Sequence, residues 1–446
     1  MHVLPQLRKL EQKYQDQMTV IGVHSAKFTA EKDTANVRKA VLRYEIEHPV
    51  VNDCDFEIWK QYGVRAWPTL MFVDPKGKII GKHEGELDVE GFDKLLGDMV
   101  AEFDAAGMLK SEPITYHLER DKELQRALSF PGKVLADPAS GRLIISDSNH
   151  NRILIATLQG RVKQVIGSGD EGLKDGSADE ARFADPQGVA LDGNTLYVAD
   201  TKNHAIRAVD LSTGDVKTIA GTGEQAPKLH PGGDAAQIQL NSPWDLIQHE
   251  GVLYIAMAGF HQLWSLNLAT SEARPYAGSG RERIVDGVLA EAALAQPSGI
   301  TTDSKKLYFT DSETSAVRAA DLDRAGNVET IVGLHLFEFG DVDGVGEDVR
   351  LQHPIGIDIL DGILYIADTY NNRIKKIDPF TREASGLIGS GVAGVTDGAA
   401  ENAKFHEPGG LSIANGKIYI ADTNNHAIRV ADMETLEVTT LELTGI

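Results

Sequence analysis

Short stretches in which apolar and polar residues alternate recur along the C-terminal three quarters of the chain. The six copies are LIISDSNHNRI (143–153), LYVADTKNHAI (196–206), LYIAMAGFHQL (253–263), LYFTDSETSAV (307–317), LYIADTYNNRI (364–374) and IYIADTNNHAI (418–428). Successive copies begin 53, 57, 54, 57 and 54 residues apart. Alternation of this kind predicts strands with one buried face, and a nearly fixed period predicts a repeat architecture.

Four short strands are predicted within each repeat. In the second repeat they cover 188–192, 196–200, 205–211 and 216–221, and residues typical of turns separate them. A four-stranded unit of about 55 residues is typical of one blade of a β-propeller. Six such blades close into a ring that leaves no exposed sheet edge. We therefore expect an all-β six-bladed propeller over residues 130–446.

A second marker, a proline, precedes the first strand of each repeat at Pro131, Pro186, Pro243, Pro297, Pro354 and Pro408. Inserts such as DGSADEARFADPQG (175–188), DGVLAEAALAQPSG (286–299) and DGAAENAKFHEPGG (397–410) stand before it. The combined pattern, PxGxxxD…LYVADTxNHxIR, resembles the NHL repeat, and this resemblance implies a propeller. In the third repeat Met257-Ala258-Gly259 replaces the Asp-Thr turn, so we expect that corner to differ.

The turns and the long inserts between blades are expected on one face of the ring, because the strands of a blade alternate in direction. Candidate contact residues on this face are Asp200, His204, Asp311, Asp368, Asp422 and His426. The aspartates equally suit a structural role, because a turn carboxylate accepts hydrogen bonds from backbone N–H groups. His204, His261 and His426 raise a metal site as an alternative, although turns on separate blades usually lie too far apart to share one ion.

The first 107 residues read as an α/β segment. The predicted elements are a helix at 2–15, a strand at 19–25, a helix around 32–47, a short helix at 56–64, a hairpin at 69–85 with its turn at Asp74-Pro75-Lys76-Gly77, and a helix near 88–105. Residues 108–129 are expected to link this domain to the propeller. Within the linker, ITYHLE (114–119) has the composition of a strand suited to pairing with the outer edge of a blade.

The stretch YGVRAWPTLMFVDPKGKII (62–80) resembles the cis-proline region of the thioredoxin superfamily, which implies that Pro68 is cis. In that superfamily the first strand leads into a Cys-x-x-Cys motif at the start of the first helix. This sequence begins at Met1, after the place of that motif, so the expected domain is incomplete. In the family's 4-3-1-2 sheet order the missing strand would lie between 69–74 and 19–25. A late start and a degenerate domain are both open explanations.

The order of domains, together with the HVLPQL start, the HPVVND run (48–53) and the WPT motif, resembles the NHL repeat-containing protein 2 family. Members of that family carry a cysteine pair and often a further C-terminal β-domain. This sequence has one cysteine, Cys54, which is not at the motif position. Dithiol–disulfide exchange therefore has no cysteine pair among these residues, and no catalytic residue is predicted.

Charge and composition narrow the function classes. The formal net charge is −22, and the first insert is dominated by acidic residues, which disfavours nucleic acid and anionic membranes as partners. No secretory signal or apolar run long enough to cross a bilayer is present, and a lone cysteine fits a reducing compartment. We expect a cytoplasmic protein, without a cofactor or metal, whose oligomeric state the sequence does not predict.

Three functions remain open. The leading hypothesis is a protein-binding scaffold that uses the propeller face and carries a redox-inactive thioredoxin-like module. The first alternative is a thiol–disulfide oxidoreductase whose cysteine pair lies upstream of residue 1. The second alternative is a metal-dependent propeller hydrolase or lyase.

Overall fold

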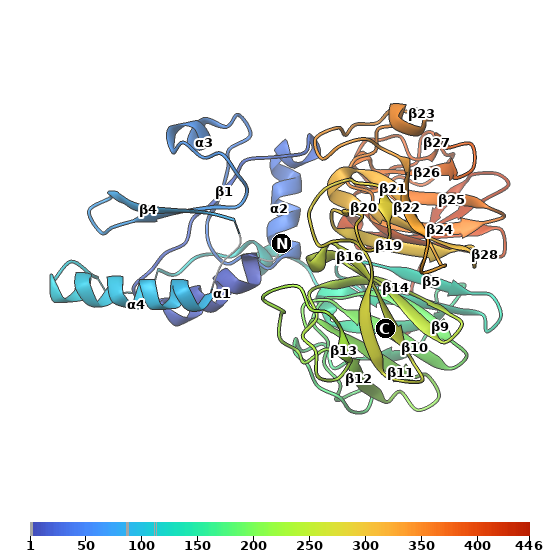
Figure 1. Cartoon of the computed structure of the whole chain (residues 1–446), viewed down its shortest axis with the longest axis horizontal. Helices are drawn as coiled ribbons and strands as arrows, with labels where there is room; N and C mark the ends of the chain where they lie inside the picture. The colour runs from blue at the N-terminus through green and yellow to red at the C-terminus, as the bar shows by residue number, and fades with distance from the viewer. Residues whose placement is uncertain (1–2, 86–88, 111, 113) are drawn as a thin grey trace. The chain divides into compact units, whose positions relative to one another are not determined.

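The chain folds as two compact units, Met1–Gln125 and Arg126–Ile446, and Figure 1 labels many of their helices and strands. The computed structural model describes all residues except 1–2, 86–88, 111 and 113. The predicted starts of two helices, at residues 2 and 88, therefore lie outside the described residues. The predicted linker 108–129 falls mainly within the first unit.

The first unit contains the predicted helices and strands, with one further strand, β2. Its elements are α1 (Val3–Lys13), β1 (Gly22–His24), the 3₁₀ helix η1 (Ala30–Lys32), α2 (Thr34–Arg43), β2 (Val50–Asn52), α3 (Glu57–Gln61), β3 (Thr69–Val73), β4 (Ile79–Glu84), α4 (Val89–Ala105) and the 3₁₀ helix η2 (Glu119–Lys122).

The strands of the first unit form two separate pairs. Strand β1 pairs with β2 in parallel, and β3 pairs with β4 in antiparallel orientation. In the described part of the chain no strand joins the two pairs. The indole Nε1 of Trp67 donates a hydrogen bond of 2.8 Å to the carbonyl oxygen of Ser25, just after β1. The Trp67–Pro68 peptide bond is cis, as the thioredoxin resemblance implies.

The segment 114–119 does not form the expected strand. Residues 119–122 form the helix η2 instead. The guanidinium group of Arg38 in α2 makes ion pairs with Glu119 at 2.7 Å and with Glu123 at 2.8 Å. These side-chain contacts hold the segment against α2 within the first unit.

The second unit is a propeller of six antiparallel sheets, each built from consecutive strands. Blade 1 contains β5 (Val134–Asp137), β6 (Arg142–Asp147), β7 (Arg152–Thr157) and β8 (Val162–Ile166). Blade 2 contains β9 (Pro186–Asp192), β10 (Thr195–Asp200), β11 (Ala205–Asp210) and β12 (Val216–Ala220). Blade 3 contains β13 (Gly233–Asp234), β14 (Pro243–His249), β15 (Val252–Met257), β16 (Gln262–Asn267) and β17 (Glu272–Ala277).

The remaining three blades repeat this arrangement. Blade 4 contains β18 (Gly287–Val288), β19 (Pro297–Thr302), β20 (Lys306–Asp311), β21 (Ala316–Asp321) and β22 (Asn327–Val332). Blade 5 contains β23 (Gly344–Val345), β24 (Gly356–Leu360), β25 (Ile363–Asp368), β26 (Arg373–Asp378) and β27 (Glu383–Ile388). Blade 6 contains β28 (Pro408–Ala414), β29 (Lys417–Asp422), β30 (Ala427–Asp432) and β31 (Val438–Thr440).

The insert before each of blades 2 to 6 folds back onto the outermost strand of that blade. In blades 3, 4 and 5 it adds the two-residue strands β13, β18 and β23. In blades 2 and 6 it makes the single bridges Gly176↔Val216 and Gly398↔Val438. The inserts thereby cover strand edges that would otherwise expose unpaired backbone groups.

The C-terminal residues cover the corresponding edge of blade 1. Val162, the first residue of β8, donates its backbone N–H to the carbonyl oxygen of Thr444 at 2.8 Å, and Thr444 donates to Gly160 at 3.1 Å. In blade 2, Val216 donates to Gly176 at 2.8 Å, in a bridge that is antiparallel where the one at Thr444 is parallel. The chain end therefore takes the place of an insert, and the ring closes without exchanging a whole strand between the first and last blades.

The hydrophobic core lies in layers between neighbouring blades. One layer, for example, packs Leu143 and Leu154 of blade 1 with Tyr419 and Ile428 of blade 6. In the described part of the chain, no helix is both long and apolar enough to cross a membrane.

Candidate functional site

The turn between the second and third strands of each blade lies beside the insert that precedes the blade. Asp200, at the end of β10, accepts a backbone hydrogen bond from Ala184 of that insert at 2.8 Å. The same bond, with a donor 16 residues upstream, recurs at Asp311, Asp368 and Asp422. We call the surface formed by these turns and the inserts 167–185, 221–242, 278–296, 333–353 and 389–407 the insert face.

The four candidate aspartates are fully buried beneath the insert face. Each lies against a buried cation seven residues further along, which is Arg207, Arg318, Lys375 or Arg429. Arg207, for example, contacts Asp200 at 2.7 Å and Asp175 of the Asp-Gly insert at 2.9 Å. Because their carboxylates are buried and paired, Asp200, Asp311, Asp368 and Asp422 hold the insert on the turn and do not offer a surface to a partner.

The pKa values reflect this burial. Loss of solvent raises the pKa of Asp200 and Asp422 to about 6 and that of Asp368 to about 7, although the paired cations and hydrogen-bond donors act in the opposite direction. For Asp175, burial also acts to raise the pKa, but hydrogen bonds from Thr218 and the charge of Arg207 outweigh it and lower the pKa below its usual value.

Blade 3 has the same turn but lacks the buried pair of an aspartate and a cation that the turns of blades 2, 4, 5 and 6 contain. Met257 and Trp264 occupy the positions of the aspartate and the arginine, and Trp264 stacks on Phe260 with ring centroids 5.3 Å apart. The expectation that this corner would differ is therefore wrong for the backbone. His261 is left-handed (φ 52°, ψ 43°), as is His426 in blade 6 (φ 56°, ψ 39°). Blade 3 therefore supports the same backbone turn with buried apolar side chains in place of a charged pair.

The left-handed residue of each turn ties its blade to the next. His204 accepts a hydrogen bond through Nδ1 from the backbone N–H of Ser242 in the insert before blade 3, at 3.0 Å. The equivalent bonds around the ring are Gln296 to His261, His353 to Ser315, Glu407 to Asn372, Phe130 to His426 and Asp185 to Asn151. His204 and His426 thus each link their blade to the next one by a hydrogen bond, and the bond from Phe130 to His426 joins the last blade to the first.

The structure does not bring the three histidines together. They belong to blades 2, 3 and 6, and each binds a different neighbouring backbone. In the chain as described, no cluster of three His, Cys, Asp or Glu side chains has the geometry of a metal site.

The axis of the propeller carries a polar cluster that the sequence analysis missed. The ammonium of Lys133 in blade 1 contacts Asp245 of blade 3 at 2.9 Å and the carbonyl oxygens of Ser298 and Ile355 at 3.2 and 3.1 Å. Lys133 and Asp245 stand where the other four blades have the glycine of Pro-x-Gly. The replacement of this glycine by two oppositely charged residues was the feature of the sequence that could have predicted the cluster.

The Lys133 cluster closes the axis at the insert-face end, where the inner strands begin. Its central group is an ammonium in contact with Asp245, so a metal cation near this position would have to displace a positive charge. This chemistry does not favour the metal-dependent hydrolase or lyase alternative.

Exposed apolar side chains gather on the inserts. In the described part of the propeller unit, nine of the twelve exposed large hydrophobic residues belong to inserts, and these are Leu173, Leu229, Val285, Val288, Phe337, Val342, Val345, Val392 and Val395. Several of them stand one or two residues before an Asp-Gly pair, a regularity that is visible in the sequence. Apolar clusters on a surface are typical of interaction sites.

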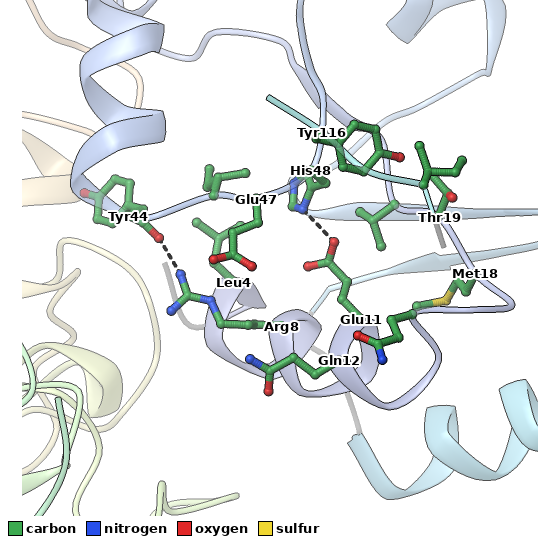
Figure 2. Close-up of a pocket in the computed structure, with 14 residues that line it drawn as sticks. Leu4, Arg8, Glu11, Gln12, Met18, Thr19, Tyr44, Glu47, His48 and Tyr116 are labelled. Carbon is green, nitrogen blue, oxygen red and sulfur yellow. Dashed lines mark hydrogen bonds and ion pairs between the residues drawn. The ribbon is translucent and has the colours of Figure 1, made fainter. Parts of the chain in front are cut away.

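The first unit has a small pocket of about 170 Å³ beside α1, and Figure 2 shows its lining. His48 is held through Nδ1 by Glu11 at 2.9 Å, and Arg8 donates to the carbonyl oxygens of Tyr44 and Glu45, each at 2.8 Å. These groups bind one another across the pocket and tie α1 to the segment before β2.

Cys54, half-buried and not in a disulfide bond, follows an aspartate with a structural role. The Asp53 carboxylate accepts hydrogen bonds from the backbone of Ile58 and Trp59, each at 2.9 Å, and from the hydroxyl of Ser25. Burial acts to raise the pKa of Asp53, but these bonds outweigh it and lower the pKa.

Comparison with known proteins agrees with this two-part description. A family model described as thioredoxin-like matches residues 1–79, and a model of the NHL repeat matches residues 183–209 and 405–431. Thiol-disulfide oxidoreductase ResA of Bacillus cereus is 31% identical over 93 residues, which cover 21% of this chain and 51% of that protein.

Two relatives match almost the whole chain. Protein SUPPRESSOR OF QUENCHING 1, chloroplastic, of Arabidopsis thaliana is 44% identical over 469 residues, covering 100% of this chain and 44% of that protein. Human NHL repeat-containing protein 2 is 40% identical over 478 residues, covering 99% of this chain and 66% of that protein. The chain thus spans less than two thirds of the length of these relatives. With both domains and the repeat motif shared along nearly all its residues, the chain belongs to the NHL repeat-containing protein 2 family.

Proposed function

We propose that this chain is a protein-binding scaffold whose insert face is the binding surface. The observation that carries the proposal is the gathering of exposed apolar side chains on the inserts. Exposing these groups to water is unfavourable, and burying them against a second protein recovers that free energy. The buried aspartates and the left-handed turn residues hold the inserts in place and leave binding to the side chains above them.

The thioredoxin-like unit acts in this proposal as an appended module without dithiol chemistry of its own. Exchange by attack and resolution requires two thiols, and residues 1–446 supply one, Cys54. We assign the protein to the cytoplasm on the same ground, since a lone thiol fits a reducing compartment. The name of the Arabidopsis relative places that protein in the chloroplast, so cell fractionation is the direct check of this assignment.

Site-specific photo-crosslinking tests the scaffold proposal. A photoreactive amino acid replaces Val342 on the insert face or Phe380 in the turn between β26 and β27, on the opposite face; both side chains are exposed. In cells of the source organism, we expect discrete crosslinked protein bands from position 342 and none from position 380. The same bands from both positions, or bands from position 380 alone, would refute the assignment of the face.

Thiol–disulfide exchange is a second candidate, and the two separate strand pairs of the first unit favour it. Strands β1 and β3 each pair on one side, which is the arrangement expected if a strand bearing a cysteine pair lies between them. Such a strand would come from outside residues 1–446. Thiol titration of the denatured, reduced protein from its natural source tests this: two thiols beyond Cys54 are required, and Cys54 alone rules the candidate out.

A further inference from the structure

We propose that the partner recognised by the insert face is a basic protein segment that also carries apolar side chains. This inference rests on the proposed function and adds the chemistry of the partner. It draws on three features of the inserts, which are their charge, their rigidity and the side chains that they leave exposed.

Negative charge is concentrated on two inserts. The insert before blade 2 carries Asp170, Glu171, Asp175, Asp179, Glu180 and Asp185 against Lys174 and Arg182. The insert before blade 5 carries Glu338, Asp341, Asp343, Glu347 and Asp348 against Arg350. In a ring of six blades these two inserts stand on opposite sides of the axis. A partner that crosses the face meets acidic groups at both ends.

Part of this charge is neutralised within the inserts. Asp175 pairs with Arg207, and Asp343 pairs with Lys375, both at 2.9 Å. Other acidic side chains are exposed, among them Glu171, Asp179, Glu347 and Asp348. These exposed carboxylates favour a cationic partner, because complementary charge speeds encounter and selects the partner.

The inserts are held in one arrangement before any partner binds. Leu173 of one insert lies against Gly223 of the next, so that a Cβ atom on Gly223 would stand 2.6 Å from Leu173 Cδ2. Asn203 donates a hydrogen bond of 2.7 Å to the carbonyl oxygen of Gly172. A surface fixed in this way loses little conformational entropy on binding.

Apolar side chains stand among the exposed carboxylates. In the insert before blade 5, Val342 and Phe337 are 49% and 68% exposed, and they belong to the same segment as Glu347 and Asp348. Charge alone would suit any cation, whereas this mixture suits a segment in which lysine or arginine alternates with leucine, valine or phenylalanine.

Three synthetic peptides of equal length test the inference against the full chain by fluorescence anisotropy. The first is amphipathic and contains lysine and leucine, the second replaces leucine with serine, and the third replaces lysine with glutamate. We expect the lysine–leucine peptide to bind at least about tenfold more tightly than either of the others. Equal or tighter binding of the glutamate–leucine peptide, or no binding of the lysine–leucine peptide, overturns the inference.

Two sets of variants locate the binding. The triple change Glu338→Lys, Glu347→Lys and Asp348→Lys reverses exposed charges on one insert, and the control Glu383→Lys, Glu434→Lys and Glu437→Lys does so on the opposite face. We expect about tenfold weaker binding of the lysine–leucine peptide for the first set and less than about twofold for the control. Equal weakening by both sets would show that binding depends only on the net charge of the protein, and it would overturn the inference.

The apolar contribution has its own variant and its own readout. Val342→Ser with Val395→Ser keeps the charge and should weaken the lysine–leucine peptide while leaving the lysine–serine peptide unchanged. Failure of the peptide experiments together with crosslinking from position 342 would refute a basic partner and keep the scaffold. Absence of crosslinks from position 342 would refute the scaffold itself.

Discussion

The ammonium group of Lys133 contacts three other blades at once, through Asp245, Ser298 and Ile355. A buried ion pair of this kind contributes little net stability compared with apolar packing, but loss of one partner leaves a buried charge unpaired. Asp245 also accepts a backbone hydrogen bond from Ile300 at 3.3 Å. The axis therefore depends on both members of the pair being present.

Replacement of Lys133 by methionine should destabilise the propeller by about 3–5 kcal/mol, because Asp245 is left charged and buried. Adding Asp245→Asn should recover part of the loss, with a coupling free energy of at least about 1 kcal/mol in a double-mutant cycle. Urea unfolding of the four proteins measures this coupling. Strictly additive effects would show that the two side chains do not act as a pair.

Asp358 gives the propeller a pH dependence. Burial raises the pKa of this carboxyl group to about 6, and the nearby charge of Asp245 acts in the same direction, although backbone hydrogen bonds from Ile413 and Ile359 oppose it. The pKa of Asp358 is higher in the folded than in the unfolded protein. Its protonated carboxyl group therefore adds to the stability of the fold at pH values below the unfolded pKa, and this stabilisation is lost as the pH rises through 6.

We therefore expect the free energy of unfolding of the wild type, relative to that of Asp358→Asn, to increase by about 1–3 kcal/mol when the pH is lowered from 8 to 4.5. The variant loses a hydrogen-bond acceptor at every pH, so the slope is the informative quantity. Urea unfolding at several pH values provides it. Parallel curves for the two proteins would place the pKa of Asp358 near its usual value.

The roles of single residues were only partly predictable from the sequence. That a turn aspartate accepts backbone hydrogen bonds was predictable from its chemistry, but the donor at Asp200 is Ala184 in the insert, 16 residues upstream, and the local sequence does not indicate it. The pairing of Asp200 with Arg207 depends on the antiparallel register of β10 and β11, which brings the two residues together from positions seven apart. The contact role assigned to the aspartates overlooked this partner and the burial that it permits.

At the level of the element, each second-to-third-strand turn is a connector between blades. The hydroxyl of Thr201 donates to the carbonyl oxygen of Pro243 at 2.7 Å, and His204 accepts from Ser242. The turn thus provides hydrogen-bond partners for two backbone groups at the start of the next blade, the carbonyl oxygen of Pro243 and the N–H of Ser242. Blades 1 and 5 use asparagine and blade 4 uses serine where blades 2, 3 and 6 use histidine, so a side-chain acceptor is the shared requirement.

Exchange of the acceptor tests this requirement. His204→Ala should cost about 1–2 kcal/mol, because the backbone N–H of Ser242 loses its partner, whereas His204→Asn should cost less than half as much. Thermal or urea unfolding compares the two variants. Equal losses would mean that the imidazole ring acts through packing and that the hydrogen bond is unimportant.

Strands and turns were predictable because each has a local signature, the alternation of apolar residues and the left-handed turn position. The outer strands β13, β18 and β23 were not predictable, because two residues carry no periodicity. Similarly, β2 in the first unit has three residues. Its pairing with β1 is set by the tertiary structure and has no local pattern.

Over the whole molecule, the six copies of the repeat predict six blades, but they do not show how the first blade is completed. Thr444 covers the edge of β8, where each of the other blades uses the insert that precedes it. The C-terminal ELTGI shares no motif with the inserts, so this role was not predictable from the local sequence. The placement of Thr444 next to Arg161 appears only once the ring is closed.

Deletion of residues 441–446 should lower the unfolding free energy by about 2–4 kcal/mol, because backbone bonds to β8 and the packing of Leu441 and Leu443 are lost. An exposed strand edge also promotes association, so the shortened protein should form larger species. Unfolding experiments and size-exclusion chromatography with light scattering measure both effects. An unchanged stability and size would show that blade 1 is complete without the chain end.

The central claim is that the insert face is where this propeller binds protein. Hydrogen–deuterium exchange of the full chain, with and without the lysine–leucine peptide, tests it most directly. We predict slower exchange in the inserts, above all around 168–183 and 333–353, and no change in the turns that join the third and fourth strands of the blades. Protection confined to those turns, or to the first unit, would contradict the account.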